Sequence, residues 1–119
     1  MPTLPFSVVH AYNLCEDTRM LVTSVTYAAE DEAARTSDSI RLKLYLEKAG
    51  VDQKWTTLEG DSQFLNGQAW LIRDGVEADA IRVEAFNLDV PSHHLVVNGR
   101  SLDIPLTGSN NTLTYRFSL

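Results

Sequence analysis

The side chains best suited to chemistry lie in three polar segments of this chain, 28–39, 59–67 and 87–93. Carboxylate oxygens are the ligands that hard cations such as calcium take, and a calcium ion needs several of them. Brought together, the three segments offer a candidate metal site whose ligands are Asp31, Asp38, Asp61 and Asp89. The competing interpretation is that these carboxylates are simply solvated, as charged residues on loops commonly are.

The same part of the chain carries side chains suited to an organic ligand. Exposed aromatic rings stack on sugars or insert into partners, and polar groups beside them orient what is bound. The candidate ligand-binding residues are Trp55, Asp61, Phe64, Asp89 and His93. Large aromatic residues usually fill the core of a small β domain, and we expect this of Trp70 in its Ala-Trp-Leu-Ile run. The polar neighbours of Trp55 leave both a core and a surface position open for it.

Motifs of the common catalytic classes are absent from the sequence. It contains no glycine-rich phosphate loop, no Gly-x-Ser-x-Gly, no paired cysteines and no His-Glu-x-x-His. The single cysteine, Cys15, adjoins Glu16 and Asp17, whose negative charges oppose formation of the reactive thiolate. We therefore expect a protein that is not an enzyme.

The elements that must position these residues are predicted from the alternation of apolar and polar side chains. The segment 40–48 reads Ile-Arg-Leu-Lys-Leu-Tyr-Leu-Glu-Lys, with an aliphatic residue at every second position. Successive side chains of a strand point to opposite faces, so this segment has one apolar and one polar face. Its residues are also good helix formers, but at about 100° per residue the aliphatic side chains would scatter around a helix. The segment is therefore predicted to be a strand.

Similar runs recur along the chain and define the fold class. They predict strands at 4–12, 20–27, 53–58, 68–73, 80–86 and 113–119, and a hairpin over 94–104 that turns at Asn98-Gly99. Segment 28–39 is predicted as a loop with a helical turn. About eight short strands in a single domain, residues 1–119, indicate an all-β fold. The predicted architecture is an antiparallel β-sandwich, jelly-roll or immunoglobulin-like, and a small β-barrel is the alternative.

The order of the strands gathers the polar segments at one end of the sandwich. Connections between successive antiparallel strands alternate between the two ends, so one end is predicted to hold 28–39, 59–67, 87–93 and 107–111. The other end then holds the mostly shorter connections 13–18, 49–52, 74–79 and 98–99. Long loops on a rigid scaffold commonly carry function, so we expect the binding site at the first end.

Charge and composition narrow the range of partners. The 119 residues carry a net charge of −6, and the 10 basic residues are scattered singly, which argues against nucleic acid and anionic membranes. No stretch approaches the roughly 20 apolar residues of a transmembrane segment. The start of the chain shows no basic and apolar signal region, so we expect cytoplasmic residence or export by a leaderless route.

Two functional hypotheses follow. The first is a structural or interaction module that acts through contacts with a protein partner or with further copies of itself, for which exposed edge strands are suited. The second is a module that binds a carbohydrate or a lipid headgroup, assisted by calcium, through the loops around 28–39, 59–67 and 87–93. No cofactor is expected for the first hypothesis, and calcium belongs only to the second.

Overall fold

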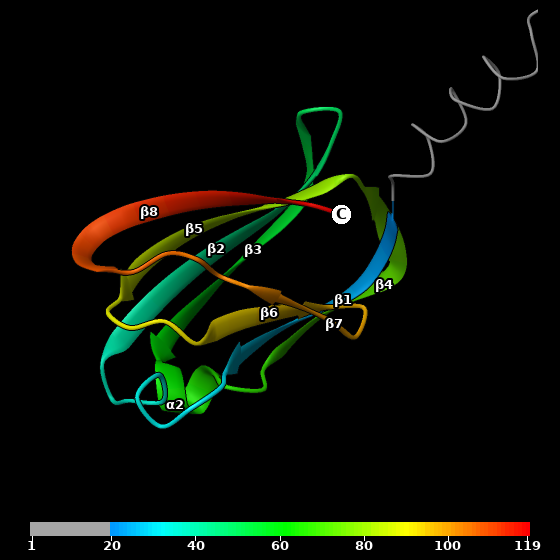
Figure 1. Cartoon of the computed structure of the whole chain (residues 1–119). Helices are drawn as coiled ribbons and strands as arrows, with labels where there is room; N and C mark the ends of the chain where they lie inside the picture. The colour runs from blue at the N-terminus through cyan, green and yellow to red at the C-terminus, as the bar shows by residue number, and fades with distance from the viewer. Residues whose placement is uncertain (1–19) are drawn as a thin grey trace, which may run out of the picture.

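Two four-stranded antiparallel sheets pack face to face in the computed structural model, which describes residues 20–119 (Figure 1). The first sheet has the strand order β4 (Ala69–Ala78), β1 (Met20–Ala29), β6 (His93–Val97) and β7 (Arg100–Asp103). The second sheet has the order β3 (Val51–Asp61), β2 (Ser39–Lys48), β5 (Ala80–Leu88) and β8 (Gly108–Ser118). A single helical turn, α2 (Ser62–Leu65), joins β3 to β4. The predicted β-sandwich is confirmed, and the described strands do not close into the barrel that was the alternative.

Strand β2 confirms the alternation argument most directly. Its aliphatic side chains Leu42, Leu44 and Leu46 are 0% exposed, while the residues between them face outward or are half-buried. The strand pairs with β3 on one side and with β5 on the other, so its backbone groups are hydrogen-bonded along both edges. The helical alternative for this segment is wrong because only a strand places all the aliphatic side chains on the face toward the core.

The other predicted strands within the described residues form as well, most of them longer than predicted. The hairpin turn at Asn98-Gly99 has φ angles of 49° and 84°, the positive values that a two-residue type I′ turn requires. Helix α2 occupies part of a segment that was predicted only as turns and a loop. The predicted strand at 4–12 and Cys15 lie outside the described residues.

The core is one cluster of buried side chains contributed by both sheets. Val25 and Tyr27 of β1 belong to the same cluster as the leucines of β2, and both are 0% exposed. Each fully buried aliphatic side chain contributes about 1.5–3 kcal/mol to folding. Trp70, expected in the core, is only half-buried and packs against this cluster from its border.

Within residues 20–119 the connections lie at the two ends of the sandwich as predicted, except that 108–111, predicted as part of a loop, begin β8, and the predicted connection at 13–18 lies outside the described residues. Segments 30–38, 62–68 and 89–92 meet at one end, where hydrogen bonds join their backbones. The amide of Gln63 donates to the carbonyl of Thr36, and the amide of Glu30 donates to the carbonyl of Ser92. No helix in the described part of the chain is long and apolar enough to cross a membrane.

Candidate functional site

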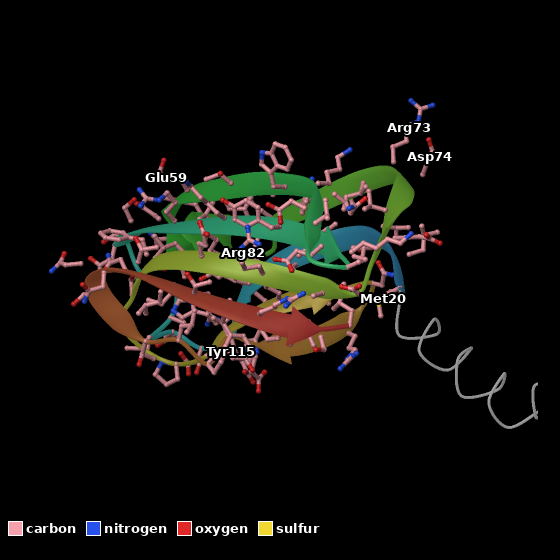
Figure 2. All side chains as sticks on the ribbon, turned by 90° about the horizontal axis from the view of Figure 1, so that it is seen from above. Met20, Glu59, Arg73, Asp74, Arg82 and Tyr115 are labelled. Atoms are coloured by element: carbon pink, nitrogen blue, oxygen red, sulfur yellow. The ribbon has the colours of Figure 1, made fainter. Side chains whose placement is uncertain are left out.

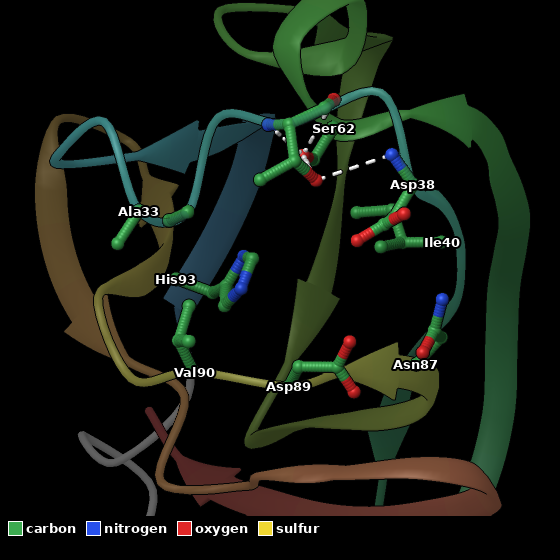
Figure 3. A pocket seen from close by; sticks show the side chains of 10 residues that line it. Ala33, Asp38, Ile40, Ser62, Asn87, Asp89, Val90 and His93 are labelled. Atoms are coloured by element: carbon green, nitrogen blue, oxygen red, sulfur yellow. Dashed lines mark hydrogen bonds between the residues drawn. The ribbon is translucent and has the colours of Figure 1, made fainter.

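A cavity of about 240 Å³ opens at the end of the sandwich where these three segments meet (Figure 3). Its polar lining comes from all three segments and the adjoining strands, and consists of Thr36, Asp38, Ser62, Asn87, Asp89 and His93. The rest of the wall is apolar and consists of Ala33, Ala34, Ile40 and Val90. A concave site with an apolar wall and a few converging polar groups is the usual form of a small-ligand site.

His93 forms the inner wall of this cavity. It is the first residue of β6, is only 3% exposed, and lies opposite Ala29 of β1. Its Nδ1 is 2.7 Å from the hydroxyl of Tyr27, and the two rings stack with centroids 5.9 Å apart. Burial raises the pKa of Tyr27 well above its usual range, so the hydroxyl stays protonated and is able to donate a hydrogen bond to Nδ1.

The surroundings of His93 favour one position for the proton of its neutral ring. The ring faces a cavity lined by the carboxylates of Asp38 and Asp89, which favour an N–H donor there, so we assign the proton to Nε2 and the acceptor role toward Tyr27 to Nδ1. Burial, and second the neighbouring charge of His94, lower the pKa of His93 below its ordinary value of 6.5. Near neutral pH the ring is therefore uncharged and presents an N–H donor.

The loop walls of the cavity are held in place by specific hydrogen bonds. The hydroxyl of Ser62 accepts from the amide of Thr36 at 2.8 Å and donates to the carbonyl of Thr36 at 3.2 Å. The side-chain amide of Asn87 donates to the carbonyl of Ser39 at 2.9 Å. The bonds of Ser62 connect segment 30–38 to α2, and the bond of Asn87 connects the start of β2 to the end of β5. Hydrogen-bonded backbone therefore shapes the cavity on two sides.

The cavity is negatively charged. The carboxylates of Asp38 and Asp89 line it, and Figure 3 shows both facing the same space as the ring of His93. No lysine or arginine is among its lining residues. The nearby Arg35 turns its guanidinium to the carbonyls of Ala29 and Glu30 instead, at 2.8 and 2.9 Å.

Three of the residues singled out from the sequence, Asp38, Asp89 and His93, therefore share this cavity. The carboxylate of Asp31 does not line it, because it accepts from the hydroxyl of Ser92 at 2.9 Å and from the amide of Ala34 at 3.1 Å. These hydrogen bonds, that from Ser92 first, lower the pKa of Asp31. Asp31 thus joins the 30–38 loop to the 89–92 loop.

The predicted set of four metal ligands is consequently divided. Asp61 lies at the end of β3, precedes α2 without a side-chain capping bond, and does not line the cavity. Within residues 20–119, no three histidine, cysteine or acidic side chains are grouped closely enough to hold a metal ion.

The two predicted aromatic ligand-binding residues lie away from the cavity. Trp55 is 63% exposed on β3, opposite Tyr45 of β2, and Phe64 is 71% exposed on α2. Neither lines the cavity. Sequence reasoning also missed Ser62 and Asn87, although both are polar residues in or next to turn segments.

The two outer faces of the sandwich differ in charge at their centres. The cross-strand rows on the outer face of the second sheet hold four acidic and four basic side chains: Arg41, Lys43, Glu47, Asp52, Glu59, Arg82, Glu84 and Arg116. Arg82, near the middle of this face in Figure 2, lies 4.1 Å above the ring of Tyr45. It pairs with Glu47, and its two terminal nitrogens lie 3.1 and 3.2 Å from the carboxylate of Asp52.

The outer face of the first sheet is uncharged at its centre. Ser24 lies opposite Leu71, and Thr26 lies between Ala69 and Val96. These five residues and Ala28 are called the neutral face below. At its border His94 lies opposite Ala28 and pairs with Asp103 and Glu30. Leu71 is 75% exposed, and β1 contains no charged residue over its 10 positions.

No protein-family model, no curated protein and no solved structure matches this chain. Its function is therefore argued from its own surfaces.

Proposed function

We propose that this chain is a non-enzymatic interaction module that pairs with a second copy of itself through the neutral face. The observation that carries the proposal is the charge contrast between the centres of the two outer sheet faces. A chain with a net charge of −6 repels its own copies, and unpaired like charges at a contact are costly. The neutral face brings no ionised side chains into opposition, so it suits a self-complementary contact.

Within the first sheet, the strand edges are less suited to pairing than the face. Edge pairing needs a long, regular strand with unpaired backbone groups, and charges and bulges oppose it. Strand β4 is interrupted between its two pairing stretches, where Asp74 and Gly75 have φ angles of 65° and 73°. Arg73 and Asp74 stand out from the ribbon there (Figure 2). On the other edge of the same sheet, β7 is only 4 residues long.

The size of the neutral face sets the expected strength. The neutral face lies on three strands spaced about 4.8 Å apart and extends over about five residues of β1 at about 3.3 Å each, which gives roughly 240 Å² of flat surface. Stable interfaces bury about 800 Å² per partner, so the pair should be weak and concentration-dependent.

The test is sedimentation equilibrium, or light scattering after size exclusion, at low and high concentration. The wild-type mass should rise with concentration toward that of a dimer. Thr26→Lys should keep the protein monomeric, because it buries a charge at the centre of the contact. Thr114→Lys, on the outer face of the second sheet opposite Glu84, is the matched control and should dimerise like the wild type.

Both variants change the net charge equally, so general repulsion cannot explain a difference between them. A wild type that stays monomeric at high concentration would contradict the proposal, as would equal dimerisation by both variants. Circular dichroism of Thr26→Lys separates loss of pairing from loss of fold.

A further inference from the structure

The cavity at the loop end has a chemical character that restricts what it accepts. Asp38 and Asp89 supply negative charge, and no basic side chain of the lining neutralises it. An anionic ligand, such as one bearing phosphate or carboxylate, would meet this charge unpaired. A ligand with a positive charge gains from it.

His93 adds a second and independent requirement. It is 3% exposed, and its Nδ1 is hydrogen-bonded to the hydroxyl of Tyr27. Its ring lines the cavity and points into it in Figure 3. Its Nε2 is not one of the buried side-chain atoms left without a hydrogen-bond partner in residues 20–119, so this nitrogen is open to the cavity and can donate to an acceptor oxygen of a ligand. A bare cation has none.

The apolar wall gives a third restriction. Ile40 is buried, Val90 is half-buried, and both line the cavity. Carbon atoms of a ligand can pack there, whereas a metal ion gains nothing from them. Calcium also needs six to eight oxygen ligands, and the described residues hold no group of three metal-ligating side chains here.

We propose that this cavity binds a small hydroxylated amine, of which an amino sugar is the test case. The ammonium group is placed between the carboxylates of Asp38 and Asp89, and a hydroxyl oxygen accepts from Nε2 of His93. Carbon atoms of the ligand then rest against Ile40 and Val90. This site lies at the end of the sandwich and does not use the neutral face, so it stands independently of the proposed pairing.

The test uses three sugars that share one ring and differ in charge: glucosamine, glucose and glucuronate. Binding is measured at a pH below neutrality, where the amine is protonated, from amide chemical shifts in ¹H–¹⁵N correlation spectra of the full chain. Glucosamine should bind most tightly, glucose more weakly and glucuronate not at all. The shifts should concentrate on segments 30–38 and 87–93.

Two variants and a control assign the charge dependence to the cavity. Asp38→Asn and Asp89→Asn should each weaken glucosamine binding about two- to fivefold, the effect of one solvent-exposed ion pair. Asp74→Asn removes the same charge on the β4 bulge, outside the cavity, and should bind glucosamine like the wild type. Because all three positions are exposed, the variants should keep their fold.

Several outcomes would overturn the assignment. One is the same affinity for glucosamine and glucuronate, and another is absence of any glucosamine response. Equal weakening by Asp74→Asn would show that net charge alone is responsible. A calcium titration is run beside the sugars, and shifts at the cavity with calcium but not with glucosamine would replace the amine by a metal ion.

Discussion

Replacement of Glu47 by glutamine tests whether the ionised network on the second sheet stabilises the fold. The Glu47 side chain is only 5% exposed, and its carboxylate pairs with Arg82 and, at 2.9 Å, with Arg116. Arg82 is 26% exposed and Arg116 is 54% exposed, so one partner is largely buried and the other is not. Glu47→Gln keeps the shape of the side chain and removes its charge.

The expected loss follows from how buried each partner is. Removing one partner of a fully buried pair costs about 3–5 kcal/mol, whereas an exposed pair contributes about 0–1 kcal/mol. Glu47 is close to the buried limit, but Arg82 retains the carboxylate of Asp52 when Glu47 is neutralised. We therefore expect the free energy of unfolding to fall by about 2 kcal/mol, between these limits. For a domain of this size that lowers Tm by roughly 8–10 °C.

The matched control is Glu59→Gln on the same face. The carboxylate of Glu59 lies 3.6 Å from Arg41, and the two side chains are 60% and 40% exposed. Its loss should cost less than about 1 kcal/mol. The assay is urea unfolding followed by tryptophan fluorescence, with the slope m compared so that a changed midpoint reports stability. Equal losses for the two variants would refute the reasoning, because burial would then not decide the strength of the pair.

Two further predictions concern His93 and Asn98. The pKa of His93 in the folded state lies below its ordinary value of 6.5, so on acidification the unfolded chain binds a proton at this residue before the folded chain does. His93 therefore lowers the free energy of unfolding as the pH falls from 6.5 through the folded pKa. The stability difference between wild type and His93→Gln should therefore shift in favour of the variant on acidification, and a pH-independent difference in urea unfolding would contradict this. The side-chain oxygen of Asn98 accepts from the amide of Thr23 at 2.9 Å, and its backbone has a φ of 49°. Asn98→Ala should lower the free energy of unfolding by about 1–3 kcal/mol, because it removes this bond and places alanine in a strained backbone conformation. Asn98→Gly, which loses only the bonds, should be the more stable of the two by thermal unfolding, and the reverse order would show that strain is unimportant.

The elements were predictable because alternation is a local property of the chain. In β2, each aliphatic residue specifies the face on which it lies, and the Asn98-Gly99 pair specifies its own turn. The order of strands within each sheet was not predictable from the same pattern. Period-2 alternation tells which face is apolar but not which neighbour pairs with it, and β1 pairs with β4 and β6, which are distant in sequence.

The cavity was predictable in part for the same reason. Counting connections placed Asp38, Asp89 and His93 at one end of the sandwich, and they do line one cavity. The count could not separate Asp31 and Asp61 from them, because it fixes the end of the sandwich and not the direction of a side chain. Ser62 holds the cavity wall through two hydrogen bonds to the backbone of Thr36, and no residue spacing in the sequence predicts such a contact.

The contrast between β1 and β2 gives the strongest reason to look for a partner on the first sheet. Both are central strands of 10 residues that are paired on both edges and bury one side in the same core. An outward face left in water is expected to carry polar and charged residues. In β2 it does, at Arg41 and Lys43, whereas the outward residues Thr26 and Ala28 of β1 are uncharged. Since fold and burial are alike in the two strands, the missing charge is not explained by packing inside the sandwich. It is explained if the outer face of β1 is covered by another chain.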